Sequence, residues 1–351
     1  MNKIPEYQIA GRPIGPQYAP YVIAEMSANH NGDLSKALQL ISIAKARGAD
    51  AVKVQTYRAD TITLNSQAPE FMISGGLWHG KSLYKLYEEA HTPWEWHGEM
   101  FAHAAKQGIT MFSSPFDTTA VDLLEDLNSP AYKIASFEAI DLPLIRYVAL
   151  TGKPMIISTG MADAEEIREA VDAARAGGCS QLALLHCVSG YPAPAGDYNL
   201  RTIPDMINRF GVLTGLSDHT LDNTTAIASV ALGACIIEKH FTLDRSDGGP
   251  DDSFSLQPDE LEQLCLGAKT AWQAMGNVDY GRKSSEVGNA QFRRSLYFVK
   301  PMKAGDTITA EHIRSVRPGF GMAPKYFDSL LGRKVNKDIE VNTAVRPECL
   351  E

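Results

Sequence analysis

Eight short apolar runs alternate with helical patterns between residues 21 and 275, and this alternation restricts the fold more than any other feature. The strand-like runs cover residues 21–26, 51–57, 110–115, 131–136, 154–160, 182–189, 212–219 and 235–241. Eight βα units in succession predict a (β/α)₈ TIM barrel, with an open eight-stranded sheet as the alternative. No Gly-x-Gly-x-x-Gly motif follows the first run, so we expect no dinucleotide site.

The helical patterns between these runs carry the expected end signals. They cover residues 33–47, 93–107, 118–126, 142–151, 163–176, 203–209, 223–232 and 258–274. Asp33 and Asp163 stand at N-cap positions, and Gly108 and Gly177 follow helix ends. Residues 58–92 are too many for a plain βα connection, so we predict a lid or a substrate-facing insertion there.

The pattern changes after residue 280. We expect a catalytic barrel over residues 1–280, a polar linker over 281–290 and a small β-rich domain over 291–351, with strands at 294–300, 303–308 and 334–345 and a helical turn near 311–313. Residues 282–351 hold 13 Lys and Arg against 8 Asp and Glu, although the whole chain has a net charge of −9. A basic tail on an acidic body favours docking between them, within or between subunits; an uneven but solvated surface is the alternative.

Composition excludes several classes of function. No apolar run approaches the roughly 20 residues that span a bilayer, and the first residues lack a signal-peptide pattern. The five cysteines show no Cys-x-x-Cys spacing, which favours a reducing, cytoplasmic compartment. There is no basic helix and no interleaving of aromatic and basic residues, so we expect no nucleic-acid or membrane partner.

Two histidines end the last two strand-like runs. His219 closes one and His240 closes the next, with one helical pattern between them. Parallel strands joined by a helix bring their carboxyl ends together, so the two imidazoles can share a divalent metal at the barrel mouth. Glu25 ends the first run and is compatible with such a site. The alternative is a pair of buried, hydrogen-bonded histidines.

Other polar residues end nearly every run. Lys53 and Gln55 alternate in the second run and Lys133 lies in the fourth, while the hydroxyl groups come from Ser114, Ser136, Ser158 and Ser217. Two lysines and several hydroxyls at one mouth describe a phosphate site. Each has a structural alternative, since a lysine can pair with a buried carboxylate and a serine can cap a helix. Together with the histidines, they favour a reaction between a phosphorylated anion and a carbonyl compound at a metal.

The same segments resemble the sialic acid synthases, the phosphoenolpyruvate-dependent nonulosonic acid synthases. Matching segments are IAEMSANHNGD, GADAVKVQTY, FSSPF, AYKIASFE, ISTGM, GLSDHTLDN, ALGACIIEKHFTLDR and GPDDSFSL. The tail RSLYFVKPMKAGDTIT and SVRPGFG resembles the family's antifreeze-like SAF domain. Within the family, the insertion GGLWHGKSLYKLYEEAHTPWEWH is similar to that of the pseudaminic acid synthases.

The resemblance implies a site and an assembly. A divalent metal, manganese or else magnesium or cobalt, would be held by His219 and His240, with Glu25 acting beside it. Phosphoenolpyruvate would be bound by Lys53, Ser114, Lys133, Ser136, Ser158 and Ser217. The amino sugar would be bound by Gln55, Glu138, Tyr191, Asp251 and Arg317, the last reaching in from the partner of a domain-swapped homodimer.

The implied reaction joins phosphoenolpyruvate to a 2,4-diacetamido-2,4,6-trideoxy hexose, giving pseudaminic acid and phosphate. N-acetylmannosamine and the diacetamido sugar that leads to legionaminic acid are the alternative acceptors. A metal-dependent aldolase, another phosphoenolpyruvate-condensing enzyme, or a binding protein with an inactive barrel are the alternative functions.

Overall fold

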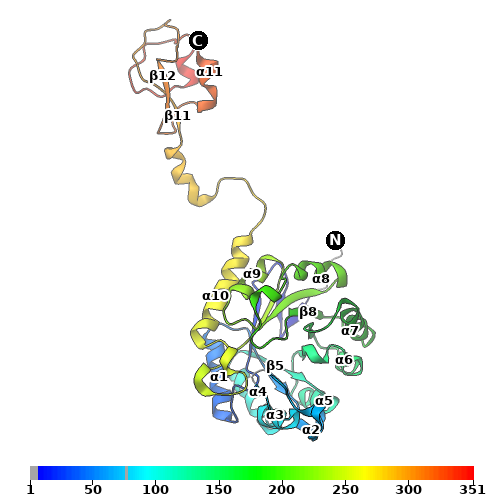
Figure 1. Cartoon of the computed structure of the whole chain (residues 1–351). Coiled ribbons are helices and arrows are strands. Elements are labelled where there is room, and N and C mark those ends of the chain that lie inside the picture. The colour runs from blue at the N-terminus through cyan, green and yellow to red at the C-terminus, as the bar shows by residue number, and fades with distance from the viewer. Residues whose placement is uncertain (1–6, 76–77) are drawn as a thin grey trace. The chain divides into compact units, whose positions relative to one another are not determined.

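The computed structural model describes residues 7–75 and 78–351, which fall into two compact units (Figure 1). The first unit ends at Gly276 and the second begins at Asn277. Within the described residues, no helix is both long and apolar enough to cross a membrane.

The first unit is a closed barrel of eight parallel strands. Its strands are β3 (Tyr21–Glu25), β4 (Ala51–Thr56), β5 (Thr110–Pro115), β6 (Tyr132–Ile134), β7 (Met155–Ser158), β8 (Leu182–Cys187), β9 (Leu213–Asp218) and β10 (Ile236–His240). They neighbour one another in chain order, and β10 pairs with both β9 and β3, which closes the ring. The predicted TIM barrel is confirmed, each strand lies within its predicted run, and the open-sheet alternative is wrong.

Helices surround this ring (Figure 1). They are α1 (Leu34–Ala46), α4 (His97–Gln107), α5 (Thr118–Asp126), α6 (Leu142–Ala149), α7 (Ala164–Ala176), α8 (Thr202–Phe210), α9 (Thr224–Ala231) and α10 (Pro258–Met275). Asp33 and Asp163 accept N-cap hydrogen bonds as predicted. Gly177 differs from a left-handed cap, since its φ is −76°. It is required instead because a Cβ there would lie 2.5 Å from Ala149 Cβ.

The insertion at residues 58–92 contains two short helices, α2 (Ala59–Ile62) and α3 (Leu83–Ala90). A single bridge between Met72 and Ser82 brings its middle part together. Gly76 and Leu77, which belong to the family-like segment of this insertion, lie outside the described residues. The insertion predicted to be a lid therefore contains helices and follows the carboxyl end of β4.

The barrel interior is apolar at the end where the strands begin. Inward-facing residues such as Ile23, Phe112 and Ile156 form one buried cluster there. Tyr7 and Ile9 join this cluster from a hairpin of β1 (Tyr7–Ile9) and β2 (Arg12–Ile14), which the sequence analysis did not predict. The hairpin therefore closes the apolar end of the barrel.

The second unit has its own apolar core and a two-stranded antiparallel sheet, β11 (Ser295–Phe298) and β12 (Ile313–Val316). A 3₁₀ helix, η7 (Ser284–Phe292), overlaps the predicted linker, and α11 (Phe327–Leu330) follows the sheet. The strands predicted at 303–308 and 334–345 are wrong, because those segments make only isolated bridges, among them Thr307–Lys334 and Met302–Ile339. The helical turn predicted near 311–313 is present as a single turn in which the His312 amide donates to the Thr309 carbonyl oxygen at 3.0 Å, and Ile313 then begins β12.

Candidate active site

The barrel interior becomes polar where the strands end. Because side chains alternate along a strand, residues two positions beyond the apolar cluster also face inward. On β10, the buried Ile236 is followed inward by Glu238 and His240. On β3 and β4, Ile23 and Ala51 are followed by Glu25 and Lys53. Two-residue alternation therefore places apolar side chains inside one end of the barrel and charged side chains inside the other end, the mouth.

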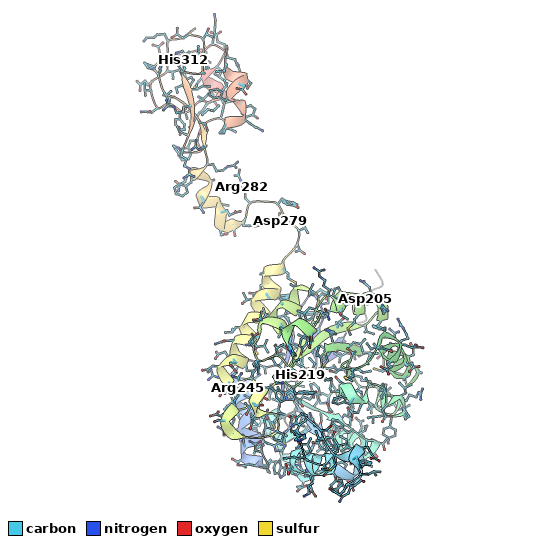
Figure 2. The ribbon with its side chains drawn as sticks, viewed as in Figure 1. Asp205, His219, Arg245, Asp279, Arg282 and His312 are labelled. Atoms are coloured by element: carbon cyan, nitrogen blue, oxygen red, sulfur yellow. The ribbon has the colours of Figure 1, made fainter. Side chains whose placement is uncertain are left out.

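The two predicted histidines meet at this mouth. Their ring centres lie 5.4 Å apart at an interplanar angle of 64°; His219, at the end of β9, is labelled in Figure 2. Two imidazoles that each bind one ion through a nitrogen at about 2.1 Å have ring centres roughly 5 Å apart. His219 Nδ1 lies 2.8 Å from the Val188 carbonyl oxygen, which leaves Nε2 with a free lone pair.

The second imidazole has a nitrogen available as well. Among the described residues, His240 Nδ1 is buried and has no hydrogen-bond partner. Burial, followed by the charges of His219 and Lys53, holds the pKa of His240 well below its ordinary value, so the ring is neutral, as a metal ligand must be. Burial lowers the pKa of His219, but Cys187 and the Val188 carbonyl raise it more, so a proton competes with a metal there.

These two side chains fit a divalent ion that keeps open coordination positions. The described residues contain no group of three or more His, Cys, Asp and Glu side chains placed to hold a metal. Catalytic metal sites commonly use three protein ligands and leave one position for water or substrate. A two-histidine site would leave more positions for oxygen atoms of the substrate or water.

The two predicted lysines form a buried charge cluster beside the histidines. Lys53 Nζ lies 2.8 Å from Glu25 Oε2, and Lys133 Nζ lies 2.7 Å from Glu238 Oε1. Lys53 Nζ also lies 3.8 Å from Glu238 Oε2, so the second carboxylate faces both ammonium groups. All four residues are at most 5% exposed. The structural alternative weighed for each lysine, pairing with a buried carboxylate, is therefore present in the structure.

The two carboxylates of this cluster differ electrostatically. Burial by itself would raise the pKa of Glu238. The charges of Lys133 and Lys53 lower it by more than burial raises it, so that it falls to about 2. Burial raises the pKa of Glu25, and Lys53 offsets only part of that rise. Glu238 therefore stays ionised and pairs with the lysines, while Glu25 is the more basic of the two carboxylates.

The predicted serines line the same mouth and leave hydrogen-bonding capacity unused. Lys53 donates to Ser114 Oγ, and Ser217 donates to Glu238 Oε1, each at 3.2 Å. Within the described part of the chain, the buried Ser158 Oγ has no partner. Ser136 Oγ accepts from the Gly160 amide at 3.2 Å. These hydroxyl groups and the two ammonium groups are suited to an oxyanion such as phosphate.

The residues predicted for the sugar surround the other side of the mouth. Gln55 donates to Glu25 Oε1 and to Ser27 Oγ, each at 3.1 Å, and Ser27 donates to Asp251 Oδ2 at 2.5 Å. Asp251 Oδ2 lies 3.8 Å from His240 Nδ1. Gln55 and Asp251 are thus connected through Ser27, which sequence analysis missed.

Aromatic rings form one wall of this region. The Tyr191 ring lies 4.4 Å from that of His219, and Phe254 lies 5.0 Å from His240. Trp78 from the insertion lies 6.0 Å from Tyr191 and donates through Nε1 to the Pro250 carbonyl at 3.3 Å. A cavity of about 500 Å³ opens beside Trp78 and Pro250. The insertion therefore contacts the barrel mouth, although its action as a lid stays a prediction.

Glu138 and Arg317, the two remaining residues predicted to bind the sugar, belong to different units of the chain. Burial raises the pKa of Glu138 to about 7, and its Oε2 is buried without a partner within the described residues. Arg317 is an exposed residue directly after β12 in the second unit. Its role at the sugar site stays a prediction.

Glu238 is the main site residue that the predicted set omitted. Its signal was present in the sequence, because two-residue alternation from Ile236 to His240 places Glu238 on the inward face. Its pairing with Lys53 and Lys133 depends on strands far apart in the chain, and no local pattern gives that.

Comparison with known proteins identifies the family of the chain. Residues 40–280 match the NeuB family, and residues 293–351 match the SAF domain. The chain therefore belongs to the NeuB family and carries a SAF domain at its C-terminal end. The predicted family membership is confirmed.

Two related enzymes and one crystal structure show how similar the chain is to individual members of the family. The chain is 43% identical over 326 residues to a pseudaminic acid synthase of Campylobacter jejuni, with 93% of this chain and 95% of the relative covered. It is 36% identical over 329 residues to the N,N'-diacetyllegionaminic acid synthase of the same strain, with 93% and 98% covered. A crystal structure of the N-acetylneuraminic acid synthetase of Leptospira borgpetersenii superimposes with a TM-score of 0.73 at 29% identity, covering 84% of this chain and 98% of that one.

Proposed function

We propose that this chain is a phosphoenolpyruvate-dependent nonulosonic acid synthase that produces pseudaminic acid. One observation carries the proposal: the buried ammonium groups of Lys53 and Lys133 and the imidazoles of His219 and His240 face the same barrel mouth. An anion site beside a pair of candidate metal ligands fits a reaction between an enol phosphate and a carbonyl compound.

The anion half of the site binds phosphoenolpyruvate. Glu238 keeps Lys53 and Lys133 charged and oriented in the absence of substrate. The entering phosphate brings negative charge to both ammonium groups, and the free hydroxyl of Ser158 adds a neutral donor. Ser114, Ser136 and Ser217 complete this subsite.

The carbonyl half binds the open-chain amino sugar. His219 and His240 would hold the divalent ion, manganese by preference, which supplies Lewis-acid polarisation of a carbonyl when bound. Gln55, Glu138, Tyr191 and Asp251 orient the sugar by hydrogen bonds and ring contact, and Tyr191 packs directly on His219.

The reaction breaks the carbon–oxygen bond to phosphate and forms a carbon–carbon bond to the sugar and a carbon–oxygen bond to water. The methylene carbon of phosphoenolpyruvate attacks the aldehyde carbon of the sugar, and water adds to the former enol carbon. That carbon then releases inorganic phosphate by carbon–oxygen cleavage. Lys53 and Lys133 stabilise the phosphate charge throughout, in a site with little exposure to solvent.

Glu25 acts as the general base for this water. Its carboxylate lies at the end of β3, directly opposite His240 on β10. Burial raises the pKa of Glu25 above its ordinary value, which makes it a stronger base than an exposed carboxylate. Lys53 Nζ lies 2.8 Å from Glu25 Oε2 and opposes this rise.

The acceptor is the 2,4-diacetamido-2,4,6-trideoxy hexose. The identity of 43% to a pseudaminic acid synthase exceeds the 36% to the legionaminic acid synthase of the same bacterial strain. The insertion at 58–92 supports the same choice, because its Trp78 reaches the aromatic wall of the mouth.

The proposed enzyme is a domain-swapped homodimer in the cytoplasm. The exposed Arg317 and the basic composition of residues 282–351 suit docking on the acidic barrel of a partner subunit. All five cysteines are free in the structure, which suits a reducing compartment.

An acceptor panel tests the proposal. The protein is incubated with phosphoenolpyruvate, Mn²⁺ and one of three acceptors, the trideoxy hexose, N-acetylmannosamine or the legionaminic acid precursor. We expect phosphate release and a product of pseudaminic acid mass with the first only. In ¹⁸O-labelled water, the phosphate should carry no label, because water attacks carbon.

A Lys53→Met variant serves as the control and should release no phosphate. Phosphate release that needs no amino sugar would contradict the proposal, and condensation with a phosphorylated or non-amino sugar would favour the rival aldolase or another condensing enzyme.

A further inference from the structure

Lys239 is a buried lysine that cannot reach substrate. It lies between Glu238 and His240 on β10, but strand alternation turns it to the outside of the barrel wall. It is nevertheless only 2% exposed, since helices cover that face. Unlike Lys53 and Lys133, it must therefore act on the protein itself.

The contacts of Lys239 all lie around the first imidazole. Its Nζ donates to Asp218 Oδ2 at 2.9 Å and to the Thr220 carbonyl oxygen at 2.5 Å. Asp218 Oδ1 in turn accepts from the Thr220 amide at 2.9 Å. Asp218 and Thr220 are the residues on either side of His219. One ammonium group therefore binds the side chain of the residue before His219 and the backbone carbonyl of the residue after it, and it stands one residue before His240.

The pair also fixes the register of the two strands. Lys239 stands directly opposite Asp218 in the pairing of β10 with β9. A slip of one residue between these strands would turn His240 out of the mouth while His219 stayed in it. An apolar pair at this position would pack without specifying that register.

A contribution to net stability does not explain why Lys239 and Asp218 form a buried ion pair. Taking two charges out of water costs about as much as their attraction returns, so a buried pair often contributes little net stability. His240 has no hydrogen bond from its own Nδ1 within the described residues, so its position depends on its strand. We propose that Lys239 and Asp218 are positioning residues that set the separation of the His219 and His240 imidazoles for metal binding. This inference rests on the metal role in the proposed function.

The test measures metal binding directly. Mn²⁺ is titrated into the full chain, and free Mn²⁺ is followed by its electron paramagnetic resonance signal. The main variant is the double substitution Lys239→Met with Asp218→Asn, which leaves no unpaired buried charge and is expected to fold. We expect Mn²⁺ to bind at least tenfold more weakly, with the KM for phosphoenolpyruvate within twofold of the original value.

A control at a partly exposed ion pair tests whether the loss of any ion pair of the barrel lowers the affinity for Mn²⁺. Lys153 Nζ lies 2.6 Å from Glu125 Oε1. Lys153 lies just before β7, so this pair lies near the end of the barrel where the strands begin, away from the histidines. The double variant Lys153→Met with Glu125→Gln should keep the original Mn²⁺ affinity.

A second reference distinguishes this inference from the proposed function. His240→Ala should lose Mn²⁺ binding. If it does, but the Lys239 and Asp218 variant binds Mn²⁺ as tightly as the original chain, the positioning role is wrong and the metal site stands. If His240→Ala binds Mn²⁺ with the original affinity, the metal assignment fails, and the positioning role fails with it.

Discussion

The two ends of the barrel interior are built from the same strands but have opposite composition. Where the strands begin, Ile23, Phe112 and Ile156 pack against the N-terminal hairpin. Where they end, Lys53 and Lys133 are as deeply buried, yet each needs a carboxylate partner. Apolar burial stabilises the fold, whereas buried ion pairs contribute little net stability. The apolar end therefore supplies the stability that allows a costly charged mouth.

The largest expected effect comes from the mouth. His219→Ala or His240→Ala should abolish turnover, because each removes one of the two proposed metal ligands. Circular dichroism and thermal unfolding should show a folded barrel, since both rings lie away from the apolar cluster. Chelation of divalent ions should have the same effect and be reversed by Mn²⁺. Turnover in metal-free buffer would disprove this role.

A pair of substitutions at the two ends tests the comparison itself. Lys133→Met should lower kcat/KM for phosphoenolpyruvate by about 10²–10³-fold, because it removes a charge from the anion site. Phe112→Ala should lower the free energy of unfolding by about 3–5 kcal/mol and leave the KM unchanged. Steady-state kinetics and urea unfolding of both variants provide the measurements. The contrast between the two ends would be contradicted if Lys133→Met lowered only stability and Phe112→Ala lowered only the affinity for phosphoenolpyruvate.

Glu25→Gln probes proton transfer at the mouth. We expect kcat to fall about 10²-fold while metal and phosphoenolpyruvate still bind, since an amide cannot accept the proton from water. Single-turnover phosphate release and a binding titration separate the two effects. Full turnover in this variant would remove the general-base role.

Trp78→Ala tests whether the insertion contributes to the acceptor site. Loss of the ring beside Tyr191 should raise the KM for the amino sugar about tenfold and leave that for phosphoenolpyruvate unchanged. Trp272→Ala is a control, because Trp272 donates to Pro16 on another part of the barrel. An equal rise in both KM values would contradict a role confined to the acceptor.

A further expected effect concerns the dependence of stability on pH and not catalysis. The pKa of Glu138 is raised to about 7, so the folded protein retains this proton at pH values at which the unfolded chain has lost it. Between about pH 4.5 and 7, the original chain should lose up to about 3 kcal/mol of stability relative to Glu138→Gln. Urea unfolding at several pH values measures this difference, with the exposed Glu169→Gln as the control. A difference that grows toward acid would have the wrong sign.

Strand alternation explains why the barrel was predictable. The β-branched runs and the caps at Asp33 and Asp163 are local signals, and the structure follows them. The positions of Glu25, Lys53 and His240 at or near the carboxyl ends of parallel strands predicted that they would face one mouth. The fold and most of the predicted set could therefore be obtained from spacing, and the family resemblance added what spacing left open.

The features that were missed depend on distant contacts. The β1–β2 hairpin has strands of only three residues and gains stability from the barrel end that it covers. In the second unit, Met302 and Ile339 form a single bridge, which no periodic pattern specifies. The ion pair of Lys239 with Asp218 is equally invisible in sequence, since a lysine in a strand gives no sign of its partner.

The closeness of the two half-sites is best tested by ³¹P relaxation of bound phosphoenolpyruvate in the presence of Mn²⁺. We predict strong paramagnetic relaxation with the original chain, and its loss in His240→Ala, which keeps the lysines and still binds phosphoenolpyruvate. Phosphoenolpyruvate that binds to the original chain while its ³¹P relaxation stays independent of bound Mn²⁺ would place the anion and the metal in separate regions, and would contradict the account.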